Sequence, residues 1–451
     1  MTPQEGIKLG TDFRITAASI ITSAGTARDI RQIFSEVNIF EDLFGSVITG
    51  NIIINDTNNL INNLPIVGFE YLALEFGKST QSQTFSKVFR IYKLSDRRRV
   101  NAQSEVYMLH FCSEEAILDE SVRISKTYTG QSISKIVQDI AKRYLKIDEI
   151  KFPAQNITPT KYLHSIVIPN WHPLYAINWL SRMAIAQDYA SSSFVFFEDR
   201  DGFHFTPVES LAVSAPIQKI LFSPRNLGFE SDKTESDLNM TLKTVYNWEL
   251  PSGFDVLQNV STGMYAGTLI SVDPIRQRIN AVGLQSSGFF EKTKHLNANN
   301  LVSNAYNRRQ RTVNEEMGSF LRIYPTTSGH NQLTYKSDST VYANRVEDWL
   351  LQRNMYMSSI HSMRLQVSMP GNINLRVGQV VEVEFPAFML NDKTEKKLDQ
   401  LYTGRYFIAA LRHSINRASH MCYLELSKES SDKSYPVANN DDKFLTKLKT
   451  L

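Results

Sequence analysis

Residues 377–385 read Val-Gly-Gln-Val-Val-Glu-Val-Glu-Phe, and a run of β-branched residues after a glycine is typical of a β-strand that starts at a turn. A similar arrangement stands near the N-terminus, where Val67-Gly68 leads into the triplet Leu74-Glu75-Phe76. In the later segment, Val377-Gly378 leads into Val383-Glu384-Phe385. Two strands with matching beginnings and ends therefore lie far apart in the chain.

The hairpins that follow these two strands match as well. Ile91-x-x-Leu94 corresponds to Ile408-x-x-Leu411. Leu109-His110-Phe111 corresponds to Leu424-Glu425-Leu426. Ile91 and Leu109 are 18 residues apart (109 − 91) in the first hairpin. Ile408 and Leu424 are 16 residues apart (424 − 408) in the second. Two interpretations stay open: a duplicated small β-barrel, or a chance likeness between strand–turn–strand patterns.

A duplicated barrel has a geometric consequence. A cyclic trimer of such a chain presents six similar barrels around its axis, so it is threefold in composition and nearly sixfold in shape. Closed heterologous interfaces hold such a ring together. The ring could join a sixfold tube on one face to a threefold object on the other.

Length and charge narrow the class of protein. The chain has 451 residues, of which 42% are apolar, so roughly three ordered domains are expected. A formal charge of +3, from 49 basic and 46 acidic residues, argues against a protein that coats nucleic acid. The densest basic run is Arg97-Arg98-Arg99, which we interpret as a solvated hairpin loop rather than a phosphate site.

The cysteines and the N-terminus indicate where the chain is made. Cys112 and Cys422 each lie in an apolar, strand-like run outside any zinc-binding or disulfide pattern, and a single bridge between them stays open as the alternative. Residues 1–8 lack the layout of a signal peptide, and no apolar run reaches the ~20 residues that span a bilayer. We expect synthesis in a reducing cytoplasm, no membrane insertion, and no use of the sequon at Asn156.

Periodicity predicts mostly β-structure with a few helices. The helical spacing of Ile133, Ile136, Val137 and Ile140 predicts a helix over 131–145. A second helix starts at Pro173, and a third covers 341–357. A polar loop is expected from Ser95 to Glu105 and a turn over 369–372. Strands are predicted within 12–112 and over 194–197, 203–205, 217–222, 240–250, 263–270, 361–368, 377–385, 405–411 and 421–426.

Candidate catalytic groups do not converge in the sequence. Glu114 and Glu115 are adjacent, and an exposed edge is the preferred interpretation of the pair. Residues 199–202, Asp-Arg-Asp-Gly, resemble the start of a calcium loop, but the later ligand positions are missing, so a hairpin turn is preferred. His204 and His413 lack partners at metal-ligand spacing. We therefore predict no catalytic, cofactor or metal site and no enzyme; the partner-binding residues are unknown.

The four tryptophans leave one alternative open. Trp171, Trp179, Trp248 and Trp349 could form a carbohydrate-binding stripe, but they fall in different predicted elements, which favours ordinary packing. A carbohydrate-binding or lytic tail-associated protein is the alternative function.

Several longer stretches resemble the baseplate central hub family of contractile-tailed bacteriophages, to which the hub part of type VI secretion spike proteins is similar. These stretches span roughly residues 40–428 and are Ser165 to Pro173, Ile177 to Leu180, Asp201 to Phe205, Gly263 to Pro274, Met369 to Gly378 and Tyr402 to Ile408. The resemblance implies an α+β, mostly β, chain with two tube-type antiparallel barrels that assembles as a homotrimeric ring.

The resemblance also implies a domain order. The expected units are a first barrel (1–115), an α+β module (116–210), a discontinuous second barrel (211–250 and 355–428), an inserted peripheral module (251–354) and a C-terminal tail (429–451).

The expected partners follow from the same resemblance. One face of the ring would bind a separate trimeric spike protein, since only about 25 residues follow the last barrel strand. The other face would bind the hexameric tail tube or a tube-initiator protein, with other baseplate proteins around it. The expected location is the tail baseplate of a virion. We expect no cofactor and no sequence-specific nucleic acid.

Overall fold

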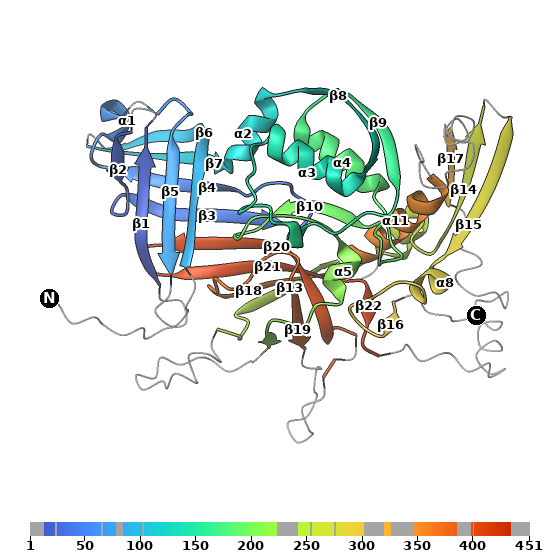
Figure 1. Cartoon of the computed structure of the whole chain (residues 1–451). Helices are drawn as coiled ribbons and strands as arrows, with labels where there is room; N and C mark the ends of the chain where they lie inside the picture. Colours follow the sequence, from blue (N-terminus) through green and yellow to red (C-terminus); the bar gives the residue numbers. More distant parts are fainter. Residues whose placement is uncertain are drawn as a thin grey trace, which may run out of the picture.

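The computed structural model describes residues 13–22, 25–64, 66–77, 84–101, 103–222, 242–252, 255–274, 277–301, 320–325, 346–385, 398–399 and 401–433. The fold is mostly β, built around one large sheet that is antiparallel in all but one of its described pairings (Figure 1). No helix in these ranges is long and apolar enough to cross a membrane.

The N-terminal part of the sheet is a group of five strands. They lie in the order β3-β4-β7-β6-β5, and β1 and β2 extend this order beyond β5. Helix α1 (Leu60–Asn63) precedes β5. The strands are β1 (Arg14–Ile21), β2 (Ala27–Asp29), β3 (Phe34–Asp42), β4 (Thr49–Asp56), β5 (Tyr71–Gly77), β6 (Thr84–Asn101) and β7 (Ser104–Cys112).

The C-terminal part of the sheet repeats this arrangement. Its strands lie in the order β13-β18-β21-β20-β19, and β12 (Lys219–Leu221) extends it beyond β19. The chain visits the five positions in the same sequence as in the first group. The strands are β13 (Asn247–Ser252), β18 (Met363–Pro370), β19 (Val380–Glu384), β20 (Gly404–Asn416) and β21 (His420–Lys428).

The two groups also share their register. Leu94 pairs with Leu109 between β6 and β7, and Leu411 pairs with Leu424 between β20 and β21. These are the leucines that match in sequence. The next strand pairs agree too. Leu74 of β5 is opposite Lys87 of β6, and at the equivalent position Val383 of β19 is opposite Gly404 of β20. The likeness between the two segments therefore extends from sequence to strand pairing.

The two groups join edge to edge within one chain. Strand β20 pairs with β3, with Ser414 opposite Asn38 and Asn416 opposite Glu36. This joint makes the ten strands one continuous sheet, and β3, β20 and β21 run beside one another at the centre of Figure 1.

An α+β region packs beside the sheet. Strands β8 and β9 form one hairpin, β10 and β11 another, and helices α3 and α4 pack against each other. The elements are α2 (Glu114–Ser121), β8 (Ile124–Ser132), α3 (Ile133–Arg143), η1 (Ala154–Asn156), β9 (Leu163–Trp171), α4 (Pro173–Met183), β10 (Phe194–Glu198), β11 (Phe203–Pro207) and α5 (Val208–Ala212). Helices α3 and α4 confirm two predictions, including Pro173 at the first helical position.

A second small sheet lies at the other end of the view. It has the order β15-β14-β17, and β14 runs parallel to β17. Helix α11 packs on it and on α4 (Figure 1). The elements are α7 (Val256–Thr262), β14 (Ala266–Asp273), β15 (Arg278–Gln285), α8 (Ser286–Phe290), β16 (Asn299–Asn300), β17 (Phe320–Pro325), α11 (Val346–Ile360) and β22 (Ser430–Ser431).

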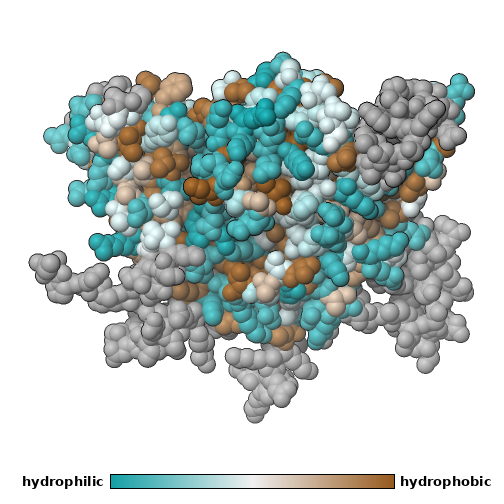
Figure 2. All heavy atoms as spheres, in the orientation of Figure 1, coloured by the Kyte–Doolittle hydropathy of each residue, from teal (hydrophilic) through white to brown (hydrophobic). Residues whose placement is uncertain are grey.

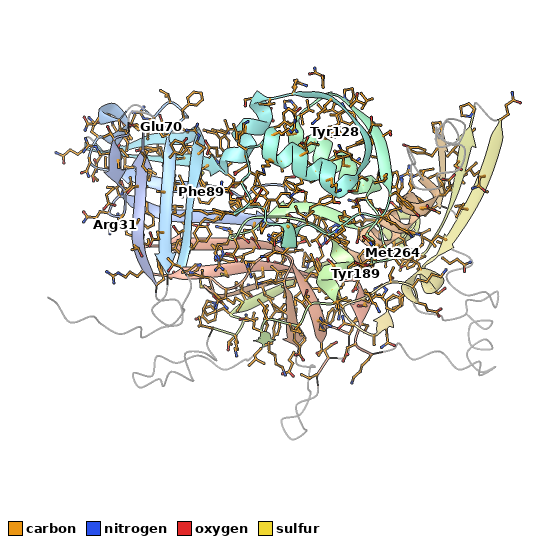
Figure 3. All side chains as sticks on the ribbon, viewed as in Figure 1. Arg31, Glu70, Phe89, Tyr128, Tyr189 and Met264 are labelled. Atoms are coloured by element: carbon orange, nitrogen blue, oxygen red, sulfur yellow. The ribbon has the colours of Figure 1, made fainter. Side chains whose placement is uncertain are left out.

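Separate apolar cores hold these parts together. Phe89 is fully buried in the core under β1–β7, and Tyr128 is buried between the helices and strands of the α+β region (Figure 3). A further core lies under the second strand group and includes Leu365 and Val380. The visible surface is mostly hydrophilic, with dispersed apolar patches (Figure 2).

Four predicted segments need correction or lie partly outside the described residues. The expected loop from Ser95 to Glu105 is strand on both sides of residues 102–103, because the ends of β6 and β7 pair as a polar, solvent-exposed ribbon. The expected turn over 369–372 begins only after Pro370, the last residue of β18. Parts of the predicted helix over 341–357 (341–345) and of the tail (434–451) lie outside the described residues.

Candidate functional site: the polar face of the sheet

The large sheet has one polar and one apolar face. In β3, the buried Val37 and Ile39 point into the core beneath the first strand group. Their neighbours Asn38 and Phe40 lie on the opposite side, because side chains alternate along a strand. The same alternation holds in β21, where Leu424 is buried and Tyr423 is 43% exposed.

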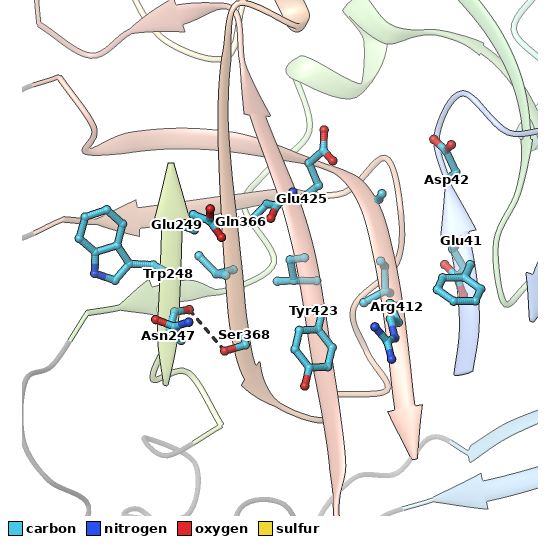
Figure 4. A pocket seen from close by; sticks show the side chains of 15 residues that line it. Glu41, Asp42, Asn247, Trp248, Glu249, Gln366, Ser368, Arg412, Tyr423 and Glu425 are labelled. Atoms are coloured by element: carbon cyan, nitrogen blue, oxygen red, sulfur yellow. Dashed lines mark hydrogen bonds between the residues drawn. The ribbon is translucent and has the colours of Figure 1, made fainter. Parts of the chain in front are cut away.

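One row of side chains crosses five strands of the polar face. Phe40 on β3 is opposite Arg412 on β20, which is opposite Tyr423 on β21. Tyr423 is opposite Ser368 on β18, which is opposite Asn247 on β13. Figure 4 shows Tyr423 and Arg412 side by side on their neighbouring strands. The row lies in an open groove of about 540 Å³.

Arg412 is fixed between Phe40 and Tyr423 in this row. Its Cζ atom lies 5.1 Å from the centroid of the Tyr423 ring and 5.8 Å from that of Phe40. Its Nε donates to Asn38 Oδ1 at 2.9 Å, and its Nη2 donates to Glu36 Oε1 at 3.3 Å. The guanidinium group is therefore paired across the β3–β20 joint.

Charges of both signs alternate on this face. Arg364 lies 3.4 Å from Glu425, and Glu249 follows on β13. Among the residues that line the groove, carboxylates outnumber the one guanidinium group, so the groove does not attract phosphates. The groove therefore forms a polar wall rather than a phosphate-binding cleft.

A protonated carboxyl lies behind the groove. Glu41 is 1% exposed, and the Val377 N–H donates to its Oε2 at 3.5 Å. Burial, assisted by the nearby Asp199 carboxylate, raises the pKa of Glu41 to about 8. The side chain is therefore neutral at pH 7.

A buried ion pair attaches the α+β region to the first strand group. Glu198 Oε1 accepts from Lys87 Nζ at 2.6 Å. Its Oε2 accepts from Ser113 Oγ at 2.5 Å and from the Ile48 N–H at 2.9 Å. Glu198 is 4% exposed. These contacts fix β10 beside the sheet.

The adjacent acids at 114 and 115 do not act as a pair. Glu114 lies 3.7 Å from Arg90 on the surface. Glu115 is buried and bonds to Lys151 Nζ at 2.7 Å, so the expectation of a wholly exposed edge is wrong for this residue. The two side chains have different partners on different elements.

The loop that resembled a calcium site is a hairpin turn, as preferred. Asp199 Oδ1 accepts from the backbone N–H groups of Asp201 and Gly202 at 2.8 and 3.0 Å. His204 Nε2 lies 3.1 Å from Asp199 Oδ2, so this histidine does have a charged partner. The pKa of Asp199 is lowered by its bond to His204, against the raising effect of burial.

The tryptophans do not form a stripe. Trp171 and Trp179 pack edge to face, with ring centroids 5.2 Å apart, at the border of the α+β core. Trp349 packs against the same core from α11. Trp248 packs on Phe385 at the edge of the sheet. Ordinary packing therefore accounts for Trp171, Trp179 and Trp349, whereas Trp248 stays 48% exposed.

The basic run is placed differently than expected. Arg97, Arg98 and Arg99 are exposed residues of strand β6, not of a loop. Arg97 and Arg99 both lie near Glu105 of β7, at 2.8 and 3.5 Å. The run therefore lies on a solvent-exposed part of a strand.

The sequence did not predict a buried cluster of His413, His420 and Cys422. His413 Nδ1 lies 3.0 Å from His420 Nε2 and 3.3 Å from Cys422 Sγ, so the statement that His413 lacks partners at metal-ligand spacing is wrong. The signal was the hairpin, because pairing β20 with β21 brings His413 opposite Cys422. Burial lowers the pKa of His413 to about 3 and raises that of the separate thiol Cys112 to about 11.

Comparison with known proteins agrees with this architecture. A probable baseplate hub protein, gp334 of Vibrio phage KVP40, is 21% identical over 412 residues, covering 90% of this chain and 92% of the phage protein. The chain resembles a phage baseplate hub protein over nearly its whole length. No family model matches it.

Two solved tail proteins share the fold. The 43 kDa tail protein of prophage MuSo2 from Shewanella oneidensis aligns at a TM-score of 0.54 and 11% identity, covering 92% of this chain and 98% of that protein. The tail protein from Neisseria meningitidis MC58 aligns at 0.52 and 10% identity, covering 92% and 96%. Type VI secretion proteins align at TM-scores of 0.44 and 0.45, which are too low to argue from.

Proposed function

We propose that this chain is a structural hub subunit of a phage tail baseplate. Three copies form a pseudo-sixfold ring that joins the hexameric tail tube to a trimeric central spike and continues the tail channel. The full-length likeness to a baseplate hub protein supports the location and the non-enzymatic role. The repeated strand group supports the ring.

The observation that carries the proposal is the joint between β20 and β3. By register, β13 is the counterpart of β3, and β6 is the counterpart of β20. Within the described ranges, β13 pairs only with β18, and residues 91–101 of β6 pair only with β7. A second joint of the same kind therefore fits between β13 of one copy and β6 of the next.

The register of this second joint follows from the first. In the first joint, Asn38 lies opposite Ser414. Their counterparts in the second joint are Glu249 and Arg98, which would lie opposite each other. Likewise, Glu36 lies opposite Asn416 in the first joint, and their counterparts Asn247 and Val100 would lie opposite each other in the second. Since Arg98 and Glu249 have opposite charge, the two edges complement each other.

Exposure at the edge fits the same joint. Val37 of β3 is 3% exposed beside β20, whereas its counterpart Trp248 on the free edge is 48% exposed. Pairing of β13 with a neighbouring β6 would bury this indole, as the intrachain joint buries Val37. An uncovered edge strand otherwise presents unpaired backbone groups.

Alternation of the two joints closes a ring of three chains and six strand groups. The polar face, on which carboxylates outnumber guanidinium groups in the groove, lines the channel and releases DNA rather than gripping its phosphates. In this ring, 1–115 and the pair 211–250 and 355–428 are the two tube-like barrels. The segments 116–210 and 251–354 lie outside them and face other baseplate proteins.

Cysteine cross-linking tests the joint directly. The variant Val100→Cys/Asn247→Cys, oxidised after purification, should yield a covalent product that stops at three chains, because a closed ring has three such joints. Each single variant is the control, since native Cys112 and Cys422 are buried. A double variant that stays monomeric, or that forms a ladder beyond three chains, would contradict the proposal.

A further inference from the structure

A cluster of two histidines and one cysteine lies inside the sheet hairpin β20–β21. His413 is directly opposite Cys422, and His420 lies two residues before Cys422 on the same face of β21. Their ligand atoms all lie within 4.8 Å of one another. The exposed fractions of His413, His420 and Cys422 are 1%, 0% and 0%.

The separations match a tetrahedral metal site. Zn–N bonds of about 2.05 Å and Zn–S bonds of about 2.3 Å place two nitrogens about 3.4 Å apart and a nitrogen and a sulfur about 3.6 Å apart. The His413 and His420 nitrogens are 3.0 Å apart. Cys422 Sγ lies 3.3 Å from His413 Nδ1 and 4.0 Å from His420 Nε2. Each value lies within about 0.5 Å of the expected one.

The backbone around the cluster supports a thiolate ligand. The Asn372 N–H donates to Cys422 Sγ at 3.3 Å, and such a bond favours the charged sulfur that a metal requires. The Asn372 carbonyl oxygen lies 3.8 Å from Sγ, near the separation of a fourth donor. Asn372 therefore contacts the sulfur through both its backbone N–H and its carbonyl oxygen.

A glycine makes room for one of the imidazoles. A Cβ at Gly371 would lie 2.1 Å from Cγ of His420, and the Gly371 N–H donates to the His420 carbonyl at 2.7 Å. Aromatic rings from the first strand group close the other side. Phe76 lies 5.5 Å from His420, and Phe85 lies 6.2 Å from His413, between ring centroids. The pocket is thus built to hold both imidazoles in a dry environment.

We propose that His413, His420 and Cys422 form a structural zinc site. Imidazole and thiolate donors suit zinc and disfavour calcium and magnesium, which take oxygen ligands. The site lies where β20 meets β3, since His413 is opposite Ile39. Bound zinc would therefore fix the second strand group against the first within one chain.

Metal content tests the site independently of ring assembly. The full chain is purified without a metal-affinity tag and without chelator. It should contain about one zinc per chain, as measured by inductively coupled plasma mass spectrometry. The variant Cys422→Ala should lose this zinc. Cys112→Ala is the matched control, because it removes the other buried cysteine and should keep the metal.

Cobalt provides a readout that does not depend on the variants. The wild-type chain is unfolded in denaturant with a chelator, freed of both and refolded with Co²⁺. It should then show the visible absorption of tetrahedral cobalt and a near-ultraviolet thiolate charge-transfer band. A wild-type chain that holds no zinc after refolding with it, or that shows no thiolate band with cobalt, would overturn the proposal. The cluster would then be a hydrogen-bonded group only.

Discussion

Tyr92 and Ala409 occupy the same position in two separate hairpins, each as the extra residue of a β-bulge. Tyr92 interrupts the ladder of β6 and β7 between Ile91 and Lys93. Ala409 interrupts the ladder of β20 and β21 between Ile408 and Ala410. A shared bulge is a stronger sign of duplication than shared strands, because bulges are placed individually and bend the sheet.

Charge reversal at the proposed intersubunit joint should prevent assembly. Arg98→Glu places two carboxylates opposite each other, so size-exclusion chromatography with light scattering should show monomers in place of trimers. Glu249→Arg combined with Arg98→Glu should restore part of the trimer.

A surface reversal away from the joint is the control for this pair. Lys142→Glu changes an exposed residue of α3 and should leave the trimer intact. Trimers that persist in Arg98→Glu would show that these two edges do not meet.

Loss of Glu198 should destabilise the contact between the α+β region and the first strand group. Glu198→Ala leaves the half-buried Lys87 ammonium group without its carboxylate, which costs about 2–3 kcal/mol of unfolding free energy. Urea unfolding followed by tryptophan fluorescence reports this region, because Trp171 and Trp179 pack against its core. The exposed Glu149 is the control, and Glu149→Ala should unfold as wild type does. Equal midpoints for the two variants would refute the assigned role of Glu198.

Stability should fall with rising pH because of Glu41. Its pKa is raised to about 8 in the folded chain, above the value in the unfolded chain, so the folded state binds the extra proton between these values. Its contribution is therefore present at low pH and is lost as pH rises toward 8, by about 1.4 kcal/mol per unit. Glu41→Gln should remove this slope between pH 5 and pH 8. Identical pH profiles of unfolding free energy in variant and wild type would contradict the assignment.

Two glycines with positive φ should respond differently to alanine. A Cβ at Gly202 would lie 2.1 Å from the Lys151 carbonyl oxygen, whereas a Cβ at Gly130 meets nothing within 4 Å. Gly130→Ala should cost about 1 kcal/mol for its backbone conformation alone, and Gly202→Ala about 3 kcal/mol or more. Thermal unfolding of both variants measures the difference. A Gly202→Ala midpoint close to that of Gly130→Ala would show that the turn can open.

The sequence predicted elements where local pattern decides the structure. The helix at Ile133 and the helix start at Pro173 follow from periodicity and from the fixed φ of proline. The matching segments around Leu94 and Leu411 pair in the same register. The domain boundaries stay a prediction.

Contacts between distant strands could not be predicted. The polar stretch from Ser95 to Glu105 suggested a loop, but a solvent-exposed ribbon is also polar, and only pairing with β7 distinguishes the two. The burial of Glu115 depends on Lys151, and that of His413 depends on a hairpin partner. Such contacts become visible only when the register is known.

End-on negative-stain electron micrographs of the purified chain test the central claim most directly. The account predicts a ring with an open centre that is threefold in averaged symmetry and nearly sixfold in outline. A compact particle without a lumen would contradict it.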